Sequence, residues 1–236
     1  MPSNYSELTI IIPTLNEEDS IPILLKEIED KITGVNVIIS DDGSKDRTKE
    51  LVESFYGNIN VKFLDRKKKK IHGLTISVLD AIKICDTPLF LVMDGDLQHP
   101  PDKIVEFYAK LKENYDLVGG KRIEVLGKWP IHRKLMSIIA TYAGRFSLLI
   151  RRRNRTKDIM SGFFASKTEI WKELLKSKEK EFTLEGYKVF FDFLKIYPFK
   201  LKLSHVDYIF GIRGQGESKI NSKVIWLYFK SLFKKG

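Results

Sequence analysis

Short apolar runs alternate with segments of helical periodicity through the first half of the chain. The runs end at polar clusters, as buried strands do, and the segments between them repeat apolar side chains every three or four positions. The predicted strands are 8–12, 35–40, 59–64, 89–93 and 116–120, and the predicted helices cover about 21–32, 46–55, 74–84 and 102–114. Continuous apolar strands between helices indicate an α/β fold, with a mostly parallel sheet covered by helices on both faces.

The alternation is lost after residue 120. We expect a helix over 130–149, a strand over 161–165, a helix over 168–176, and a strand within 206–218 that runs into a glycine-rich loop. The apolar and aromatic segment 224–233 fits either a second helix at a membrane interface or a terminal helix docked on the core. Because no repeat or long linker interrupts the chain, we expect a single domain.

Composition limits the kind of protein this can be. A chain of 236 residues that is 43% hydrophobic can bury a substantial core. Its single cysteine, Cys85, excludes an internal disulfide framework and a cysteine-based zinc site, and we expect it to be a buried thiol. The first residues lack the basic and apolar regions of a signal peptide, and the apolar stretch 135–150 is short and contains Arg145. We therefore expect a cytoplasmic protein that starts out soluble.

Basic residues give the chain a formal net charge of +10 and cluster at 66–70, 151–157 and 230–236. Such clusters attract phosphate in a nucleic acid, a nucleotide or an anionic membrane surface, although 66–70 could equally be a solvated loop. A nucleic acid is the least favoured partner. Acidic residues at three strand ends would repel its backbone, and no strand carries the spaced aromatic and basic residues of an RNA-stacking sheet.

Polar side chains follow three of the predicted strands. Asn16 and Glu17 come after the first strand, Asp41 and Asp42 after the second, and the segment 94–98 after the fourth. In parallel sheets, ligands bind beyond the carboxyl ends of the strands. Three strand ends that direct polar groups to one edge therefore predict a binding site there.

The segment "DGDLQ" contains the strongest candidate chemistry. In an extended strand end, residues two apart face the same side, so Asp94, Asp96 and Gln98 can converge. Three oxygen donors suit Mg²⁺ or Mn²⁺ that also binds substrate phosphates. The structural alternative is that one aspartate caps the helix after Pro100 and the other is a solvated turn residue.

The segment "DDGS" (41–44) is weaker evidence for a binding site, because two interpretations of it are equally well supported. An aspartate at this strand end can accept hydrogen bonds from a base or a ribose. Alternatively, the segment is an Asx-turn in which Gly43 has positive φ and Asp42 bonds its own backbone.

Six motifs in this order carry a family resemblance: "IIPTLNEE", "DDGSKDRT", "DGDLQHPP", "GKWPIHRKLMS", "SGFFA" and "FGIRGQGESK". From about residue 8 to residue 230 the chain resembles the polyprenyl-phosphate (dolichol-phosphate) mannosyltransferases of glycosyltransferase family 2. The resemblance implies the Rossmann-like GT-A fold, with a nucleotide and metal half over about 1–120 and an acceptor and membrane-facing half over about 121–236.

The resemblance also implies site residues. The metal ligands would be Asp94, Asp96 and Gln98, and the nucleotide sugar would be bound by Pro13, Leu15, Glu17, Asp41, Asp94, Asp96 and Arg213. The acceptor phosphate would be bound by Arg122, Arg133, Ser137 and Lys188. Catalysis would depend on Asp96, Arg122, Arg133 and Arg213. The loop 211–219 would close over the donor diphosphate.

The implied reaction is inverting transfer of mannose from GDP-mannose to dolichyl phosphate. Transfer from UDP-glucose, or to a non-lipid acceptor, is the alternative. Leu15, Lys121, Gln215 and the proline-free "KDIMSG" depart from the family pattern and leave the base and sugar open. The acceptor phosphate is largely dianionic at neutral pH and needs no general base, which fits four scattered histidines.

A lipid acceptor would also explain the segment 129–150, which combines Trp129, His132, Arg133 and Lys134 with a long apolar stretch. That combination suits a helix lying among lipid headgroups, whereas the alternative is an ordinary amphipathic helix packed on the sheet. We expect peripheral attachment to the cytoplasmic face of an anionic membrane, with a possible anchoring partner.

Overall fold

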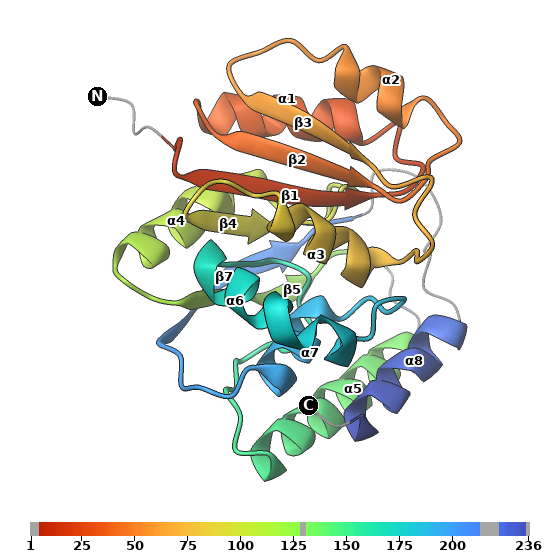
Figure 1. The fold of residues 1–236 in the computed structure, drawn as a ribbon, viewed down its shortest axis with the longest axis vertical. Coiled ribbons are helices and arrows are strands. Elements are labelled where there is room, and N and C mark those ends of the chain that lie inside the picture. Colours follow the sequence, from red (N-terminus) through yellow and green to blue (C-terminus); the bar gives the residue numbers. More distant parts are fainter. Residues whose placement is uncertain (1–4, 128–130, 213–221, 235–236) are drawn as a thin grey trace.

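The computed structural model describes residues 5–127, 131–212 and 222–234, and within these the side chains of all but 131–136 and 222–225. One seven-stranded sheet with the strand order β3-β2-β1-β4-β6-β5-β7 runs through this part of the chain (Figure 1). The strands are β1 (Leu8–Thr14), β2 (Asn36–Asp41), β3 (Asn60–Asp65), β4 (Leu89–Val92), β5 (Leu117–Val125), β6 (Phe164–Lys167) and β7 (Leu203–Phe210).

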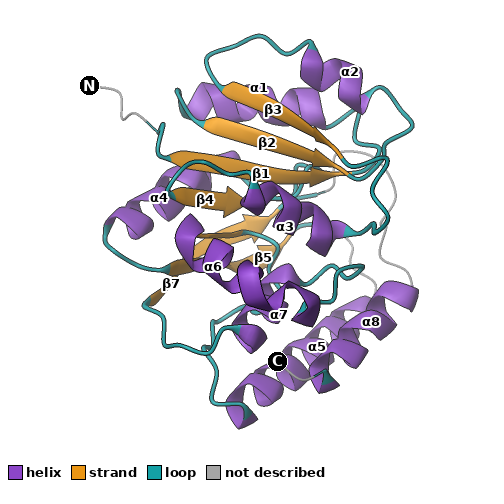
Figure 2. Cartoon of the chain, in the orientation of Figure 1, coloured by secondary structure: helices purple, strands orange, loops and turns teal. Residues whose placement is uncertain are grey.

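Helices cover both faces of this sheet, as the sequence predicts (Figure 2). They are α1 (Ile21–Lys31), α2 (Thr48–Glu53), α3 (Leu74–Lys83), α4 (Ile104–Lys112), α5 (Ile131–Ile150), α6 (Thr168–Lys178), α7 (Val189–Ile196) and α8 (Ser222–Phe233), with 3-10 turns η1 (Pro101–Lys103) and η2 (Glu179–Glu181). Successive strand residues alternate between two cores. Ile10 and Ile12 pack with α1, α2 and α4, whereas Ile11 packs with α3, α5, α6, α7 and α8.

Strand β6 is the one described strand that runs antiparallel to both of its neighbours, β4 and β5. Strands β5 and β7 are parallel to each other and run in the same direction as β1, β2 and β4. The residues that precede β6 therefore lie at the same edge as the carboxyl ends of these five strands. This topology brings 158–163 to the predicted binding edge.

One prediction in the second half is wrong in detail, and one helix was missed. The predicted strand 161–165 is β6, which begins at Phe164, and α7 was not predicted at all. Every residue of α7 is buried, and a short, mostly apolar run such as "VFFDFLKI" cannot be assigned to a buried helix or a buried strand from its pattern alone. Its two charged residues satisfy each other, because Lys195 Nζ lies 3.1 Å from Asp192 Oδ1 and also donates to the Ser231 carbonyl.

Helix α8 is docked on the core, as one of the two alternatives for the segment 224–233 predicts. Tyr228 and Leu232 are buried, and the Tyr228 hydroxyl donates to the Ala140 carbonyl of α5 at 2.7 Å. A Cβ at Gly144 would lie 2.5 Å from both Ile159 and the Tyr228 hydroxyl, so the glycine permits this close approach. In Figure 1, α5 and α8 lie side by side beyond the β7 end of the sheet.

Candidate active site

The loops that follow β1 and β2 are tied together at the carboxyl edge. The Asn16 backbone N–H donates to Ser44 Oγ at 2.7 Å, and the Asn16 side-chain oxygen accepts from the Lys45 backbone N–H at 2.8 Å. The Glu17 backbone N–H donates to Thr48 at 3.0 Å, and its carboxylate accepts from Ser20. These hydrogen bonds fix the loops after β1 and β2 in place beside the half-buried Pro13 and Leu15.

The "DDGS" segment forms the turn that one of its two readings predicts, but the bonding side chain is Asp41 instead of Asp42. The buried Asp41 carboxylate accepts from the backbone N–H groups of Gly43 and Ser44 at 3.0 and 2.8 Å, and from the hydroxyls of Ser44 and Thr14. Gly43 has the expected positive φ, 96°. A contact between Asp41 and a nucleotide stays a prediction.

Asp42 instead accepts from Arg66, the first residue of the basic cluster 66–70. Arg66 is 1% exposed, and it also donates to Asp80 Oδ2 at 3.0 Å and to Ser77 Oγ at 2.8 Å. Arg66 is therefore neither a solvated residue nor a phosphate ligand, because its charge is neutralised inside the fold. The four lysines that follow it are exposed.

Asp94, Asp96 and Gln98 follow β4 at the predicted edge. They lie in a bend and not in the predicted extended strand end, because β4 ends at Val92 and Leu97 has φ 66°. Asp96 is 5% exposed, and its Oδ1 accepts from the Gln98 backbone N–H at 3.2 Å. Gln98 Nε2 donates to the Gly211 carbonyl at 3.0 Å, which fixes the amide with its oxygen as the remaining acceptor. The helix-capping alternative is wrong, because neither η1 nor α4 has a side-chain cap.

This set fits a divalent cation that substrate phosphates help to bind. Within 5–127, 131–212 and 222–234, no three His, Cys, Asp or Glu side chains come together as a metal site. Two carboxylates and one amide oxygen are the hard donors that Mg²⁺ and Mn²⁺ accept, and such ions usually complete their coordination with waters and phosphate oxygens. The donors that are present therefore suit the predicted cofactor.

His99 fixes the backbone of the acidic segment 94–98 through a hydrogen bond. The backbone N–H of Asp94 donates to His99 Nδ1 at 2.9 Å, and the imidazole stacks on Phe163 with 4.8 Å between ring centroids. Burial lowers the pKa of His99 to about 3, so the ring is neutral and accepts this bond throughout the physiological range.

Arg122 and Lys188 both form hydrogen bonds to the segment 158–160, at the carboxyl edge of the sheet. Arg122 Nε and Nη2 donate to the two carboxylate oxygens of Asp158 at 2.7 and 3.1 Å. The Met160 backbone N–H donates to Asp158, and the Met160 carbonyl accepts from Lys188 Nζ at 2.6 Å. Two of the cations predicted to bind the acceptor phosphate are therefore held by the same turn, residues 158–160.

Asp94 lies close enough to Arg122 and Lys188 to affect their pKa values. Burial, with the charge of Arg122, lowers the pKa of Lys188 from 10.5 to about 8, although Asp158 and Asp94 act in the opposite direction. Burial also acts to lower the pKa of Arg122, but Asp158 outweighs it, and Asp94 adds to the rise. A Cβ at Gly162 would lie 3.3 Å from the Asp94 carboxylate, so the glycine leaves room for that side chain.

The other predicted residues are placed less completely. Ser137 lies on α5 with a partly buried side chain, and its carbonyl accepts from Thr141. Arg133 lies on the first turns of α5, but its side chain is outside the described part, as are Arg213 and most of the glycine-rich loop. Asp158 was missed, although an acid three residues before "SGFFA" is visible in the sequence.

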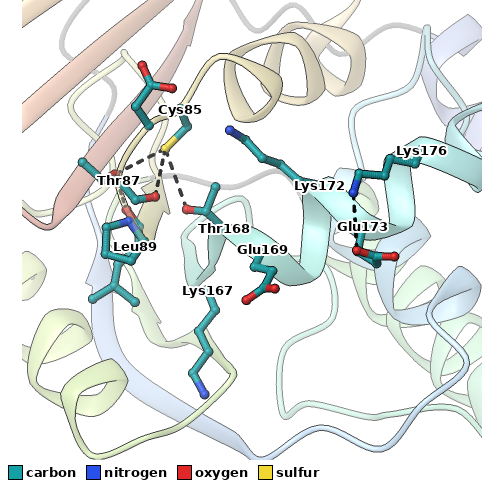
Figure 3. Close-up of a pocket in the computed structure, with 11 residues that line it drawn as sticks. Cys85, Thr87, Leu89, Lys167, Thr168, Glu169, Lys172, Glu173 and Lys176 are labelled. Atoms are coloured by element: carbon teal, nitrogen blue, oxygen red, sulfur yellow. Dashed lines mark hydrogen bonds and ion pairs between the residues drawn. The ribbon is translucent and has the colours of Figure 1, made fainter.

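A hollow of about 640 Å³ lies at the opposite edge of the sheet (Figure 3). Its lining includes Pro88 and Leu89 at the start of β4, Lys167 at the end of β6, and Cys85, which is buried as predicted. Its Sγ lies 3.3 Å from Thr87 Oγ1. None of the predicted site residues lines this hollow.

None of the helices in the described part has the length and apolar character needed to cross a membrane.

Known proteins match this chain over most of its length. The pattern of glycosyl transferase family 2 matches residues 9–175. A dolichol-phosphate mannosyltransferase of Pyrococcus furiosus is 34% identical over 233 residues, which cover 97% of this chain and 63% of that protein. A dolichol-phosphate mannosyltransferase of Saccharomyces cerevisiae is 26% identical, with 96% of this chain and 85% of that protein covered.

A solved structure shares the fold. Glucosyl-3-phosphoglycerate synthase of Mycobacterium tuberculosis, crystallised with Mn²⁺, UDP and glucosyl-3-phosphoglycerate, superposes with a TM-score of 0.63 at 16% identity, covering 95% of this chain and 77% of that chain. The resemblance inferred from the six motifs and the GT-A fold are both confirmed. The chain belongs to glycosyltransferase family 2.

Proposed function

We propose that the protein transfers mannose from GDP-mannose to dolichyl or another polyprenyl phosphate, with inversion, at the cytoplasmic face of a membrane. The observation that supports this most directly is the shared field of Asp94, Arg122 and Lys188. Under this proposal the donor diphosphate and the acceptor phosphate would bind side by side, because Asp94 is close enough to both cations to raise their pKa values. The names of the dolichol-phosphate mannosyltransferases that the chain resembles agree with this acceptor.

The chain's residues divide the work between donor and acceptor. Asp94, Asp96 and Gln98 would hold Mg²⁺ or Mn²⁺, which when bound offsets the charge of the departing diphosphate. Arg122 and Lys188 neutralise and orient the acceptor phosphate, whose oxygen forms a bond to the sugar C1. The bond from C1 to the diphosphate oxygen breaks at the same time, and GDP leaves with the electron pair. Because the acceptor is already a dianion, no side chain has to remove a proton.

Helix α5 supports attachment to a membrane. Six large residues on it share one 120° sector of the helix and are 45–69% exposed: Ile138, Ile139, Tyr142, Phe146, Leu149 and Ile150. The opposite side, with Ala140, Gly144 and Leu148, is packed on the protein. Exposed Arg145 and Arg152 flank this apolar stripe and suit anionic headgroups. A membrane-anchoring partner protein would add a second means of attachment to the membrane.

The function is tested with purified protein, a labelled nucleotide sugar, Mn²⁺ and a short polyprenyl phosphate. We expect a mannosyl-lipid product from GDP-mannose and at least tenfold less product from UDP-glucose. Asp96→Ala should abolish transfer and metal-dependent nucleotide binding while the thermal unfolding midpoint stays within a few degrees. Unchanged turnover in Asp96→Ala would remove the metal-site assignment.

The donor and the acceptor are tested separately. A thermal-shift panel of GDP, UDP, GDP-mannose and UDP-glucose, with and without Mn²⁺, identifies the base and sugar. Efficient transfer to a soluble saccharide or a protein, with none to polyprenyl phosphate, would overturn the lipid acceptor and leave the glycosyltransferase assignment intact.

A further inference from the structure

Asp158 holds the side edge of the Arg122 guanidinium. A guanidinium has five N–H donors in a rigid plane, and it can present a pair of them along either of two edges. Asp158 occupies the edge formed by Nε and Nη2, at 2.7 and 3.1 Å. Among the described residues, none takes the end edge, formed by Nη1 and the second proton of Nη2, and this edge can bind another anion. A phosphate matches that edge with two parallel hydrogen bonds.

The carboxylate is itself fixed. Its Oδ1 accepts from the Met160 backbone N–H at 3.0 Å, and the side chains of Asp158 and Arg122 are only 12% and 17% exposed. The guanidinium carbon lies 5.8 Å from the centroid of the Phe210 ring. A partly buried side chain that is already held by two hydrogen bonds loses little further conformational freedom when a ligand binds, so Arg122 is oriented before binding.

The same turn also places the second cation. The Met160 carbonyl accepts from Lys188 Nζ at 2.6 Å, two residues after the carboxylate that holds Arg122. The turn that Asp158 helps to fix thus places both cations, and the positive charge that remains after Arg122 pairs with Asp158 suits a phosphate dianion. Replacing the carboxylate by an amide would keep the shape of the turn but remove one of the two strong acceptors of the fork.

We infer that Asp158 is a positioning residue for the acceptor phosphate. It acts through Arg122, by occupying one edge of the guanidinium and directing the other edge at the phosphate monoester. This inference rests on the proposed function, because it takes the Arg122 and Lys188 cluster as the acceptor site.

A double-mutant cycle tests the role directly. Binding of farnesyl phosphate is measured by calorimetry, without a nucleotide sugar, for the wild type, Asp158→Asn, Arg122→Met and the double variant. We expect Asp158→Asn to weaken binding at least fivefold in the wild-type background and less than twofold in the Arg122→Met background. A residue with a merely structural role would weaken binding equally in both.

Asp116→Asn is the matched control. It removes the partner of another partly buried ion pair, since Asp116 Oδ1 lies 2.8 Å from Lys167 Nζ near the other edge of the sheet. We expect it to leave farnesyl phosphate binding within twofold of the wild type. In turnover assays, Asp158→Asn should raise the KM for the lipid acceptor and leave the KM for the nucleotide sugar unchanged.

The outcomes separate the two proposals. If the wild type does not bind farnesyl phosphate, the acceptor assignment fails, and the role of Asp158 fails with it. If the wild type binds, a loss below fivefold in Asp158→Asn, or equal losses in both backgrounds, overturns the positioning role alone. If Asp158→Asn does not fold, Asp158→Glu is used with the same thresholds, because it keeps the charge but displaces the fork by one methylene.

Discussion

The backbone N–H of Asp94 donates to Nδ1 of His99 at 2.9 Å, beneath the acidic segment that follows β4. The bond requires a neutral imidazole, and burial of His99 lowers its pKa to about 3. His99 is therefore a structural part of the site whose protonation opposes folding.

Replacing His99 should reduce the acid sensitivity of the fold. The unfolded chain takes up a proton at His99 below about pH 6.5, whereas the folded protein does not do so until about pH 3, so stability is lost as the pH falls through this window. This group should contribute roughly 2 kcal/mol of the stability difference between pH 7 and pH 5. Urea unfolding of His99→Leu at the two pH values should show that much less difference than the wild type. An identical pH dependence would contradict the assignment.

Lys188 should impose an alkaline limit on use of the lipid acceptor. Its pKa of about 8 means that its charge is lost as the pH rises through 8, while the acceptor phosphate stays dianionic. We expect kcat/KM for the acceptor to fall above about pH 8 in the wild type, and Lys188→Met to be about tenfold less active at pH 7 without that limb. Lys172→Met, at the opposite edge of the sheet, should behave as the wild type.

The same depressed pKa of Lys188 should also make the stability of the fold depend on pH. Between about pH 8 and pH 10.5 the unfolded chain binds the Lys188 proton and the folded protein does not, so the free energy of unfolding should rise with pH across this range. The rise should be absent in Lys188→Met.

Arg66 should be a large contributor to stability among the basic residues. Arg66→Met would leave Asp42 and Asp80 without the buried cation that they share, and should reduce the free energy of unfolding by about 3–5 kcal/mol. Lys49→Met is the comparison, because Lys49 also pairs with two acids but is half exposed, and it should cost no more than about 1 kcal/mol. Equal losses in chemical denaturation would show that Arg66 is not neutralised inside the fold.

The apolar stripe of α5 should determine binding to lipid. Phe146→Ser and Tyr142→Ser each remove a large exposed side chain, and either should weaken co-sedimentation with vesicles rich in anionic phospholipid by about tenfold. Ile23→Ser is the control, since Ile23 is 50% exposed on α1, on the far side of the sheet from α5 (Figure 1). A loss of binding in Ile23→Ser as large as in Phe146→Ser would contradict a specific membrane-facing helix.

The sequence by itself determined the α/β class, the strands of the first half and the edge of the sheet at which the candidate site residues lie. Apolar runs such as 8–12 and 89–93 report burial on both faces, and the carboxyl ends of parallel strands have to meet at one edge. The acidic segment 94–98 could be placed there because its position depends only on the end of a neighbouring strand.

Only the tertiary structure decided which charges act together. Arg66 and Asp42 are 24 positions apart, and Arg122 and Asp158 are 36 apart, so nothing local shows that the first pair is internal or that the second holds a guanidinium ready for an anion. The reversal of β6 likewise brings Asp158 to the edge, and α7 stayed hidden because it is buried on every side. The physical reason is the same in each case: pairing and burial depend on distances between segments that local periodicity does not encode.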